Sequence, residues 1–239
     1  ARHRQNQADK LLADLGDDVD VVADVCWHSN FLSAVMRQTE RYQPDLLLVP
    51  RRENHDFLDW LIGGEEQDLL RELHTPMLFA NGTDWPAHPR IAVALNPFHT
   101  DTRDDQLEVE LLKTADLMAQ RLSAEMHVVH CFLSLPQATI FDEQIITDYA
   151  SLQSRVGEEH RNRIEALLSR IDRPVGGPLM QLLEGEVQVE LPRFVEEQRI
   201  DILLLGTHEH SLLERLLLGS TTERLLARIG CDVLVLHAG

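Results

Sequence analysis

Residues 201–239 read DILLLGTHEHSLLERLLLGSTTERLLARIGCDVLVLHAG and contain two apolar runs, "DILLLG" (201–206) and "DVLVLHA" (232–238). Neither run shows the alternation of a half-exposed strand, so both predict strands that are buried on both faces of a parallel sheet. Between them, "STTERLLARIG" (220–230) has apolar residues at helical spacing and ends in a glycine, a common helix terminator. This strand, helix, strand order predicts an α/β fold.

The same alternation extends upstream. Strands are predicted at 90–96, 125–133 and 177–185, and helices at 106–122, 142–171 and 187–198. Pro192 lies inside the last of these helices and fits there best if it occupies the first turn. Strands that alternate with helices predict an open parallel sheet with helices on both faces.

The chain also contains an internal repeat. The segment that begins at Asp45 aligns without a gap with the segment that begins at Asp201, at an offset of 201 − 45 = 156 residues. The aligned pairs include Gly63 with Gly219, and apolar positions match along both segments. The repeat therefore predicts a tandem duplication of one α/β domain.

The loop of the second copy carries a family motif. Gly206, Glu209, Gly219 and Ser220 resemble the G-x2-G-x9-G-[ST] signature of the universal stress protein family, with Glu209 in place of the middle glycine. The tandem arrangement most resembles the two-domain universal stress protein E type. The resemblance implies two tandem adenine-nucleotide-alpha-hydrolase-like (Rossmann-like) domains, each with a five-stranded parallel sheet. The expected strand order is the flavodoxin-like 2-1-3-4-5 or its close variant in this family, 3-2-1-4-5. It also implies a cytoplasmic role in the bacterial stress response.

The repeat sets the predicted domain boundaries. Residues 1–84 are predicted to be the C-terminal part of the first domain, and residues 85–239 a complete second domain, with a "DWP" linker at 84–86. If the second domain begins at Arg90, the matching position of the first is 90 − 156 = −66. We therefore expect the N-terminal domain to be incomplete in this chain by about 70 residues, roughly one βαβ unit with its flanks.

The resemblance also defines a candidate cofactor site. In nucleotide-binding members, the loop glycines and the final Ser or Thr hold the ATP phosphates, and an aspartate at the end of the first strand recognises the nucleoside. Here that strand ends in Asn96, so the candidate residues are Gly206, Glu209, Gly219, Ser220 and Asn96. Glu209 adds a Cβ where the backbone should approach the ligand, and it places negative charge beside a polyphosphate. We therefore expect a degenerate nucleotide loop and no bound cofactor.

The retained glycines Gly63 and Gly219 have two explanations. Each gives a tight entry to the helix that follows, where Ser220 or Thr221 is a suitable N-cap and Glu223 lies in capping-box range. The alternative is a small anion at the same helix N-terminus.

Composition and histidine spacing exclude several functions. The formal charge of −18, from 40 acidic and 22 basic residues, argues against nucleic acid and anionic membranes as partners. His208 and His210 have no further ligand pair at a recognised spacing, so no metal site is predicted. His127 and His130 lie three apart on a strand and should point to opposite faces. No nucleophile elbow is present, and no enzyme activity is predicted.

Three functional hypotheses remain. The favoured one is a non-catalytic tandem stress protein whose halves pack about a pseudo-two-fold through their last strands, "TPMLFA" (75–80) and "DVLVLHA" (232–238), with a homodimer as a further option. The second is an ATP-binding, weakly hydrolysing switch that uses the loop of the second domain. The third is a carrier of an apolar small ligand beside residues 141–171.

Overall fold

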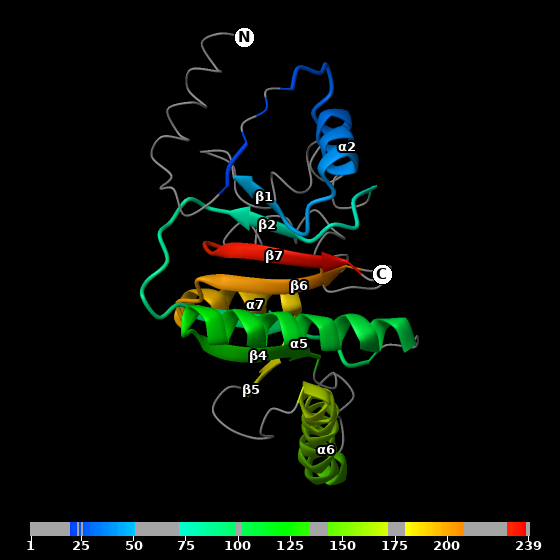
Figure 1. Ribbon diagram of the computed structural model, residues 1–239. Helices are drawn as coiled ribbons and strands as arrows, with labels where there is room; N and C mark the ends of the chain where they lie inside the picture. Colours follow the sequence, from blue (N-terminus) through cyan, green and yellow to red (C-terminus); the bar gives the residue numbers. More distant parts are fainter. Residues whose placement is uncertain are drawn as a thin grey trace. The chain divides into compact units, whose positions relative to one another are not determined.

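The computed structural model describes residues 20–22, 24, 26–50, 72–98, 102–133, 143–171, 180–207 and 229–237, with the backbone alone for 102–105 and 143–150. The chain divides into two parts, Ala1–Gln43 and Pro44–Gly239. The first part holds helix α2 (Phe31–Tyr42), and the second part holds the sheet (Figure 1). No helix within these ranges is long and apolar enough to span a membrane.

The described strands of the second part form one sheet with the order β1-β2-β7-β6-β3-β4-β5. Their bounds are β1 Leu47–Pro50, β2 Met77–Ala80, β3 Arg90–Ala94, β4 Glu125–Phe132, β5 Met180–Glu184, β6 Ile202–Thr207 and β7 Asp232–His237. The helices of this part are α5 Thr102–Leu122, α6 Glu143–Leu168 and α7 Val187–Glu197, and the 3₁₀ turn η2 spans Ser169–Ile171. The predicted strands and helices are therefore found, except for the helix predicted at 220–230. Residues 220–228 lie outside the described residues, and residues 229–230 are not helical.

Strands β5, β4, β3, β6 and β7 are parallel throughout. Counted in chain order from β3, their spatial order is 3-2-1-4-5, the second of the two orders expected. The numbering of the strands changes direction between β3 and β6, which makes this the switch point of the sheet. Open α/β sheets bind ligands outside the carboxyl ends of the two strands at the switch point.

The core of this sheet lies beneath α5 and α6. Leu107, Leu111 and Leu112 of α5 are buried together with Ile91 of β3 and Ile164 of α6. Helix α7 packs on β4 and β5, with Phe194 against the ring of His127. His130, three residues further along β4, instead contacts α6, so the two histidines point to opposite faces, as predicted.

Pro192 does not occupy the first turn of α7. Since the helix begins at Val187, Pro192 is its sixth residue, and it is buried. A proline there removes one backbone hydrogen bond. Leu191, Phe194 and Val195 are buried on either side of it, and this apolar packing offsets the lost bond, so the helix continues to Glu197.

The sheet register repeats at the offset seen in the sequence. In the β1–β2 pair Leu47 lies opposite Met77, and in the β6–β7 pair Leu203 lies opposite Val233. Each position in the second pair is 156 residues beyond its counterpart in the first. The same pairing geometry is therefore present in both copies.

The connections that follow α2 and α7 also match. Gln43 has a left-handed backbone with φ 44°, and Arg199, 156 residues later, has φ 51°. The two helices begin at Phe31 and Val187, which differ by the same offset. Neither residue is a glycine, although a left-handed backbone is uncommon for other residues, so the two copies share an unusual helix ending.

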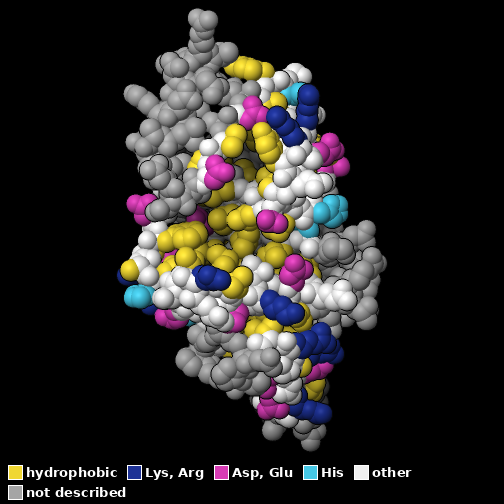
Figure 2. Space-filling model, in the orientation of Figure 1, with side chains coloured by type: hydrophobic (Ala, Val, Ile, Leu, Met, Phe, Trp, Pro, Cys, Tyr) yellow, Lys and Arg dark blue, Asp and Glu magenta, His cyan; other side chains and the backbone are white. Residues whose placement is uncertain are grey.

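Strand β2 joins β7 in the one antiparallel pairing among the described strands. Leu78 lies opposite Leu234, its own repeat counterpart. Figure 2 shows hydrophobic side chains gathered over β2 and β7 on this face. The Asp232 carboxylate accepts hydrogen bonds from the Asn81 backbone N–H at 2.7 Å and from Trp85 Nε1 at 2.9 Å. Trp85 belongs to the segment predicted as a linker, so this segment is fixed to β7.

Candidate functional site

Two of the five candidate cofactor residues lie at the sheet's switch point. Asn96 follows β3, and Gly206 lies near the carboxyl end of β6, the strand hydrogen-bonded to β3. Glu209, Gly219 and Ser220 lie outside the described residues. The structure therefore brings together Asn96 and Gly206, and the role of the remaining loop stays a prediction.

Gly206 is explained by the close approach of α5. A Cβ on this residue would lie 2.8 Å from Leu107 Cδ2 and 3.0 Å from Leu111 Cδ1. Both leucine side chains are buried, with 1% and 0% exposure, so they have little room to move. Helix packing alone thus favours glycine here, without a bound phosphate.

Replacing Gly206 with alanine should destabilise the protein by about 1–3 kcal/mol, the range expected for overpacking a filled core. The change is measured by urea unfolding. Gly157→Ala is the matched control, because no atom lies within 4 Å of the Cβ position there. Gly157 is inside α6, where alanine should instead stabilise the helix by up to about 1 kcal/mol. Equal stability of Gly206→Ala and the native chain would contradict the packing explanation.

A buried carboxylate lies at the same strand end. The Asn96 backbone N–H donates to Glu108 Oε1 at 3.2 Å, and Glu108 of α5 is only 3% exposed. Our sequence reasoning missed this residue. The sequence pattern could have revealed Glu108, because it lies three residues before Leu111 on the apolar stripe of a predicted helix. An uncharged residue is expected at such a position. Glu108 therefore places a second acidic group near the position expected for a nucleotide.

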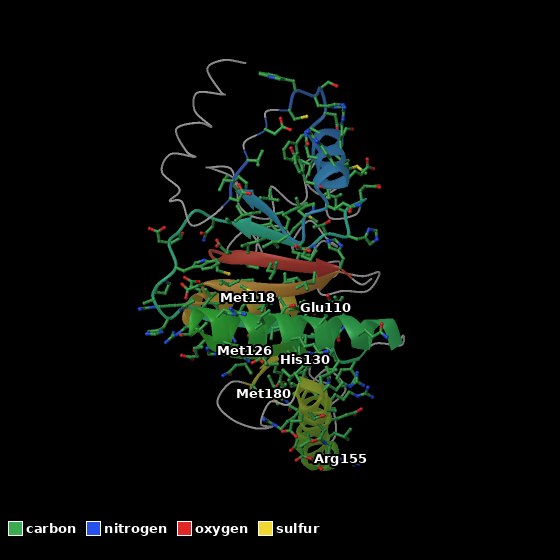
Figure 3. All side chains as sticks on the ribbon, viewed as in Figure 1. Glu110, Met118, Met126, His130, Arg155 and Met180 are labelled. Atoms are coloured by element: carbon green, nitrogen blue, oxygen red, sulfur yellow. The ribbon has the colours of Figure 1, made fainter. Side chains whose placement is uncertain are left out.

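His130 of β4 lies beside this strand end, where α6 comes up to the sheet (Figure 3). It is 3% exposed, with Nδ1 2.8 Å from the Leu95 carbonyl oxygen and Nε2 2.6 Å from His160 Nδ1. A carbonyl oxygen only accepts, so His130 Nδ1–H is the donor. Nε2 of the neutral ring then accepts from His160 Nδ1–H. The tautomers of both rings follow from this chain of hydrogen bonds.

Aromatic rings enclose the two histidines. The His160 ring centroid lies 4.1 Å from that of Phe98 and 4.6 Å from that of Phe132. Arg163 Cζ lies 4.4 Å from the Phe98 centroid, in a cation–π geometry. Burial lowers the pKa of His160, the nearby Glu159 opposes this effect, and Arg163 adds to it. We refer to His130, His160, Phe98, Phe132 and Arg163 as the ring cluster.

The comparisons with known proteins agree with this geometry. A model of the universal stress protein family matches residues 99–237. The chain belongs to the universal stress protein family. It is 22% identical over 218 residues to a universal stress protein E homolog of Haemophilus influenzae, covering 91% of this chain and 70% of the relative. It is 23% identical over 232 residues to universal stress protein E of Escherichia coli, covering 93% and 70%. The resemblance to the universal stress protein E type is confirmed.

Solved structures of the family share the fold of this universal stress protein. A putative universal stress protein from Pseudomonas aeruginosa superimposes with a TM-score of 0.72 at 18% identity, covering 99% of this chain and 78% of that chain. A universal stress protein from Archaeoglobus fulgidus gives a TM-score of 0.56 at 16% identity, covering 100% and 78%. At these identities the likeness establishes the fold alone.

The histidines considered as metal ligands fall into two groups. His208 and His210 lie outside the described residues. His127 Nε2 lies 2.8 Å from Glu125 Oε1, and burial lowers the pKa of His127 despite that carboxylate. Within the described ranges, no group of three or more His, Cys, Asp or Glu side chains could hold a metal ion.

Proposed function

We propose that this universal stress protein acts in the stress response as a non-catalytic, cytoplasmic protein that lacks conventional ATP binding. Membership of the family supports the stress-response role. The observation that carries the proposal is the side-chain arrangement at the switch point. There the Asn96 N–H is bound to the buried Glu108 carboxylate, and Gly206 packs against α5. The two candidate residues that the structure describes are thus both engaged by groups of α5.

Electrostatics support the same proposal. An ATP-binding site needs donors and positive charge close to the phosphates. This switch point instead has the Glu108 carboxylate within hydrogen-bonding distance of the strand end. The sequence adds Glu209 at the middle position of the loop. Two carboxylates near one polyphosphate would weaken its binding, because like charges repel strongly at short distance.

The pairing of β2 with β7 supports a pseudo-dimeric arrangement of the two copies. A two-fold axis through the Leu78–Leu234 pair exchanges the Met77–Val235 and Phe79–Val233 pairs. We propose that the two domains pack about this axis and present their surfaces to protein partners as a unit. A homodimer and an apolar small ligand stay predictions from the sequence.

Calorimetric titration of ATP with magnesium tests the proposal. We expect no heat of binding for the native chain at up to about 1 mM ATP, which corresponds to a binding free energy weaker than about −4 kcal/mol. Glu209→Gly should gain affinity because it removes a Cβ and a charge from the loop. Adding Glu108→Gln should strengthen binding again, because it removes the second charge.

Glu197→Gly is the matched control for the lost charge, since Glu197 is the last residue of α7 and belongs to neither strand end. It should leave ATP binding unchanged. Micromolar binding by the native chain would overturn the proposal, and the nucleotide switch would become the leading function.

A further inference from the structure

We propose that Asn81 is a site of spontaneous deamidation, and that the carboxylate formed there weakens the antiparallel β2–β7 joint between the two copies. Asn81 directly follows β2 and precedes Gly82. The proposal is independent of ATP binding, because it uses neither the loop at 206–220 nor the strand end at Asn96. It rests on the position of an Asn-Gly pair beside the buried carboxylate of Asp232.

Deamidation requires the backbone nitrogen of the next residue to reach the side-chain carbonyl carbon of the asparagine. Among the asparagines of the sequence, only Asn81 precedes a glycine, which has no Cβ to obstruct this approach. Gly82 is exposed, and its backbone is left-handed with φ 80°. Outside its chain neighbours, no described heavy atom lies within 4 Å of the position that a Cβ would take. The structure therefore leaves room for the reaction and for water.

The reaction needs only water as a co-reactant. The Gly82 nitrogen forms a bond to Asn81 Cγ and loses its proton. The Cγ–Nδ2 bond breaks and Nδ2 leaves as ammonia with that proton, which closes a succinimide ring. Water then adds to one of the ring carbonyl carbons, and the bond from that carbon to the ring nitrogen breaks. The product is aspartate or isoaspartate, and each has a carboxylate in place of the amide.

Two hydrogen bonds of the Asn81 side chain affect the reaction rate in opposite directions. Oδ1 accepts from the Thr83 backbone N–H at 2.8 Å, and this donor stabilises the negative charge that Oδ1 gains during the attack. Nδ2 donates to the Gly230 carbonyl oxygen, which holds the leaving amide in place. The folded chain should therefore react more slowly than a free peptide by up to about tenfold, the factor for one net hydrogen bond.

The new carboxylate disturbs the joint in two ways. A carboxylate only accepts hydrogen bonds, so at position 81 it loses the bond to the Gly230 carbonyl oxygen. It also lies close to the carboxylate of Asp232, which is 5% exposed and accepts from the Asn81 backbone N–H at 2.7 Å. Like charges repel strongly at such a part-buried position. Because Asp232 also binds Trp85 Nε1, the repulsion reaches the segment between the copies.

The modification affects one side of the pseudo-two-fold axis. The position equivalent to Asn81 in the second copy is His237, which is followed by Ala238. A histidine has no side-chain amide to lose, so the second copy keeps its end of the joint unchanged. Since the ammonia diffuses away, the reaction does not reverse, and the modified fraction increases with the age of the protein.

Mass spectrometry of the tryptic peptide 72–90 during storage at pH 8 tests the site, because this peptide contains no other asparagine. Aspartate and isoaspartate should accumulate in the native chain, at a rate within about tenfold of that in a synthetic peptide of residues 76–88. Asn81→Gln should give no product over the same time, because its longer side chain closes a ring much more slowly. Complete reaction of the synthetic peptide without any product in the native chain would overturn the proposal.

The effect on the joint is measured on the modified fraction, which anion exchange separates from the native chain, and on Asn81→Asp. Both should unfold at a lower urea concentration than the native chain. In both, the protection of the β2 amides against hydrogen exchange should fall by about tenfold, because a hydrogen bond is lost and two carboxylates repel. The modified fraction forms from folded protein, so this measurement stands even if Asn81→Asp does not fold.

Asn162→Asp is the matched control, because Asn162 is exposed on α6 and gains the same charge. Its unfolding midpoint and the protection of its β2 amides should stay close to the native values. Equal midpoints for the native chain and the modified fraction would contradict the effect on the joint. An equal loss of stability in Asn162→Asp would do the same, since the effect would then come from added charge anywhere on the surface.

Discussion

Replacing Phe79 with alanine should lower the free energy of unfolding by about 3–5 kcal/mol, the range for removing a large aromatic side chain from a packed core. Phe79 is fully buried in β2. It lies opposite Val49 of β1 on one side and Val233 of β7 on the other. Its ring therefore belongs to the joint between the two copies, and its loss would leave a cavity there.

Leu48→Ala on β1 is the control for this prediction, because Leu48 is 64% exposed. An exposed substitution should change stability by no more than about 0.5 kcal/mol. Urea unfolding of the native chain and both variants gives the comparison. A loss below about 1 kcal/mol for Phe79→Ala would show that the antiparallel joint is a loose contact and not a core. It would also remove the packing support for a pseudo-dimeric unit.

Much of the fold could be predicted because the strands have a simple composition. The run at 201–206 has no internal polar residue after Asp201, as a strand covered on both faces requires. The repeat also predicts that the two copies pair their strands in the same register, because two copies of one sequence should fold alike. The Leu47–Met77 and Leu203–Val233 pairs have that relation.

The sequence could not say how the helix at 187–198 accommodates Pro192, because helix propensity is a local quantity. The position of a proline in a helix predicts one lost hydrogen bond, but not the burial of the residues around it. In α7, burial of Leu191, Phe194 and Val195 decides the outcome.

The ring cluster could not be predicted, since it depends on distant contacts. Phe98 follows β3, and His160 lies on α6, 62 residues later in the chain. No spacing rule links two positions so far apart. The sequence placed His130 on a strand and on the face opposite His127, and only the packing of α6 supplied its partner. Unlike the ring cluster, Glu108 could have been predicted, because a charged residue on an apolar helix stripe is visible in the sequence.

Acid should weaken the joint between the copies through His237. This residue ends β7, and its ring centroid lies 6.1 Å from that of His74, which precedes β2. Burial, with a smaller contribution from the charge of His74, lowers the pKa of His237 from 6.5 to about 4. The folded state thus binds this proton less well than the unfolded state. The stabilisation is complete above pH 6.5 and is lost as the pH falls toward 4.

The loss of stability in acid can be calculated from the difference between the two pKa values of His237. Each unit of pKa is worth about 1.4 kcal/mol, so the drop from 6.5 to about 4 sets an upper limit of ~3.4 kcal/mol. His237 is only part-buried, and solvent screening should reduce the measured loss to about 2 kcal/mol between pH 7 and pH 4.5.

His237→Asn is the matched variant, because Asn81 stands 156 residues earlier, at the equivalent position of the first copy. On its side of the pseudo-two-fold, the Asn81 side chain donates to the Gly230 carbonyl oxygen. An asparagine at 237 has the same neutral donor and faces His74, the counterpart of Gly230. Urea unfolding at the two pH values should show about 2 kcal/mol less acid destabilisation for the variant than for the native chain. An equal loss in both would mean that carboxylates elsewhere govern the acid response. In that case, replacing His237 by the asparagine found at the equivalent position of the first copy would not change how stability depends on pH.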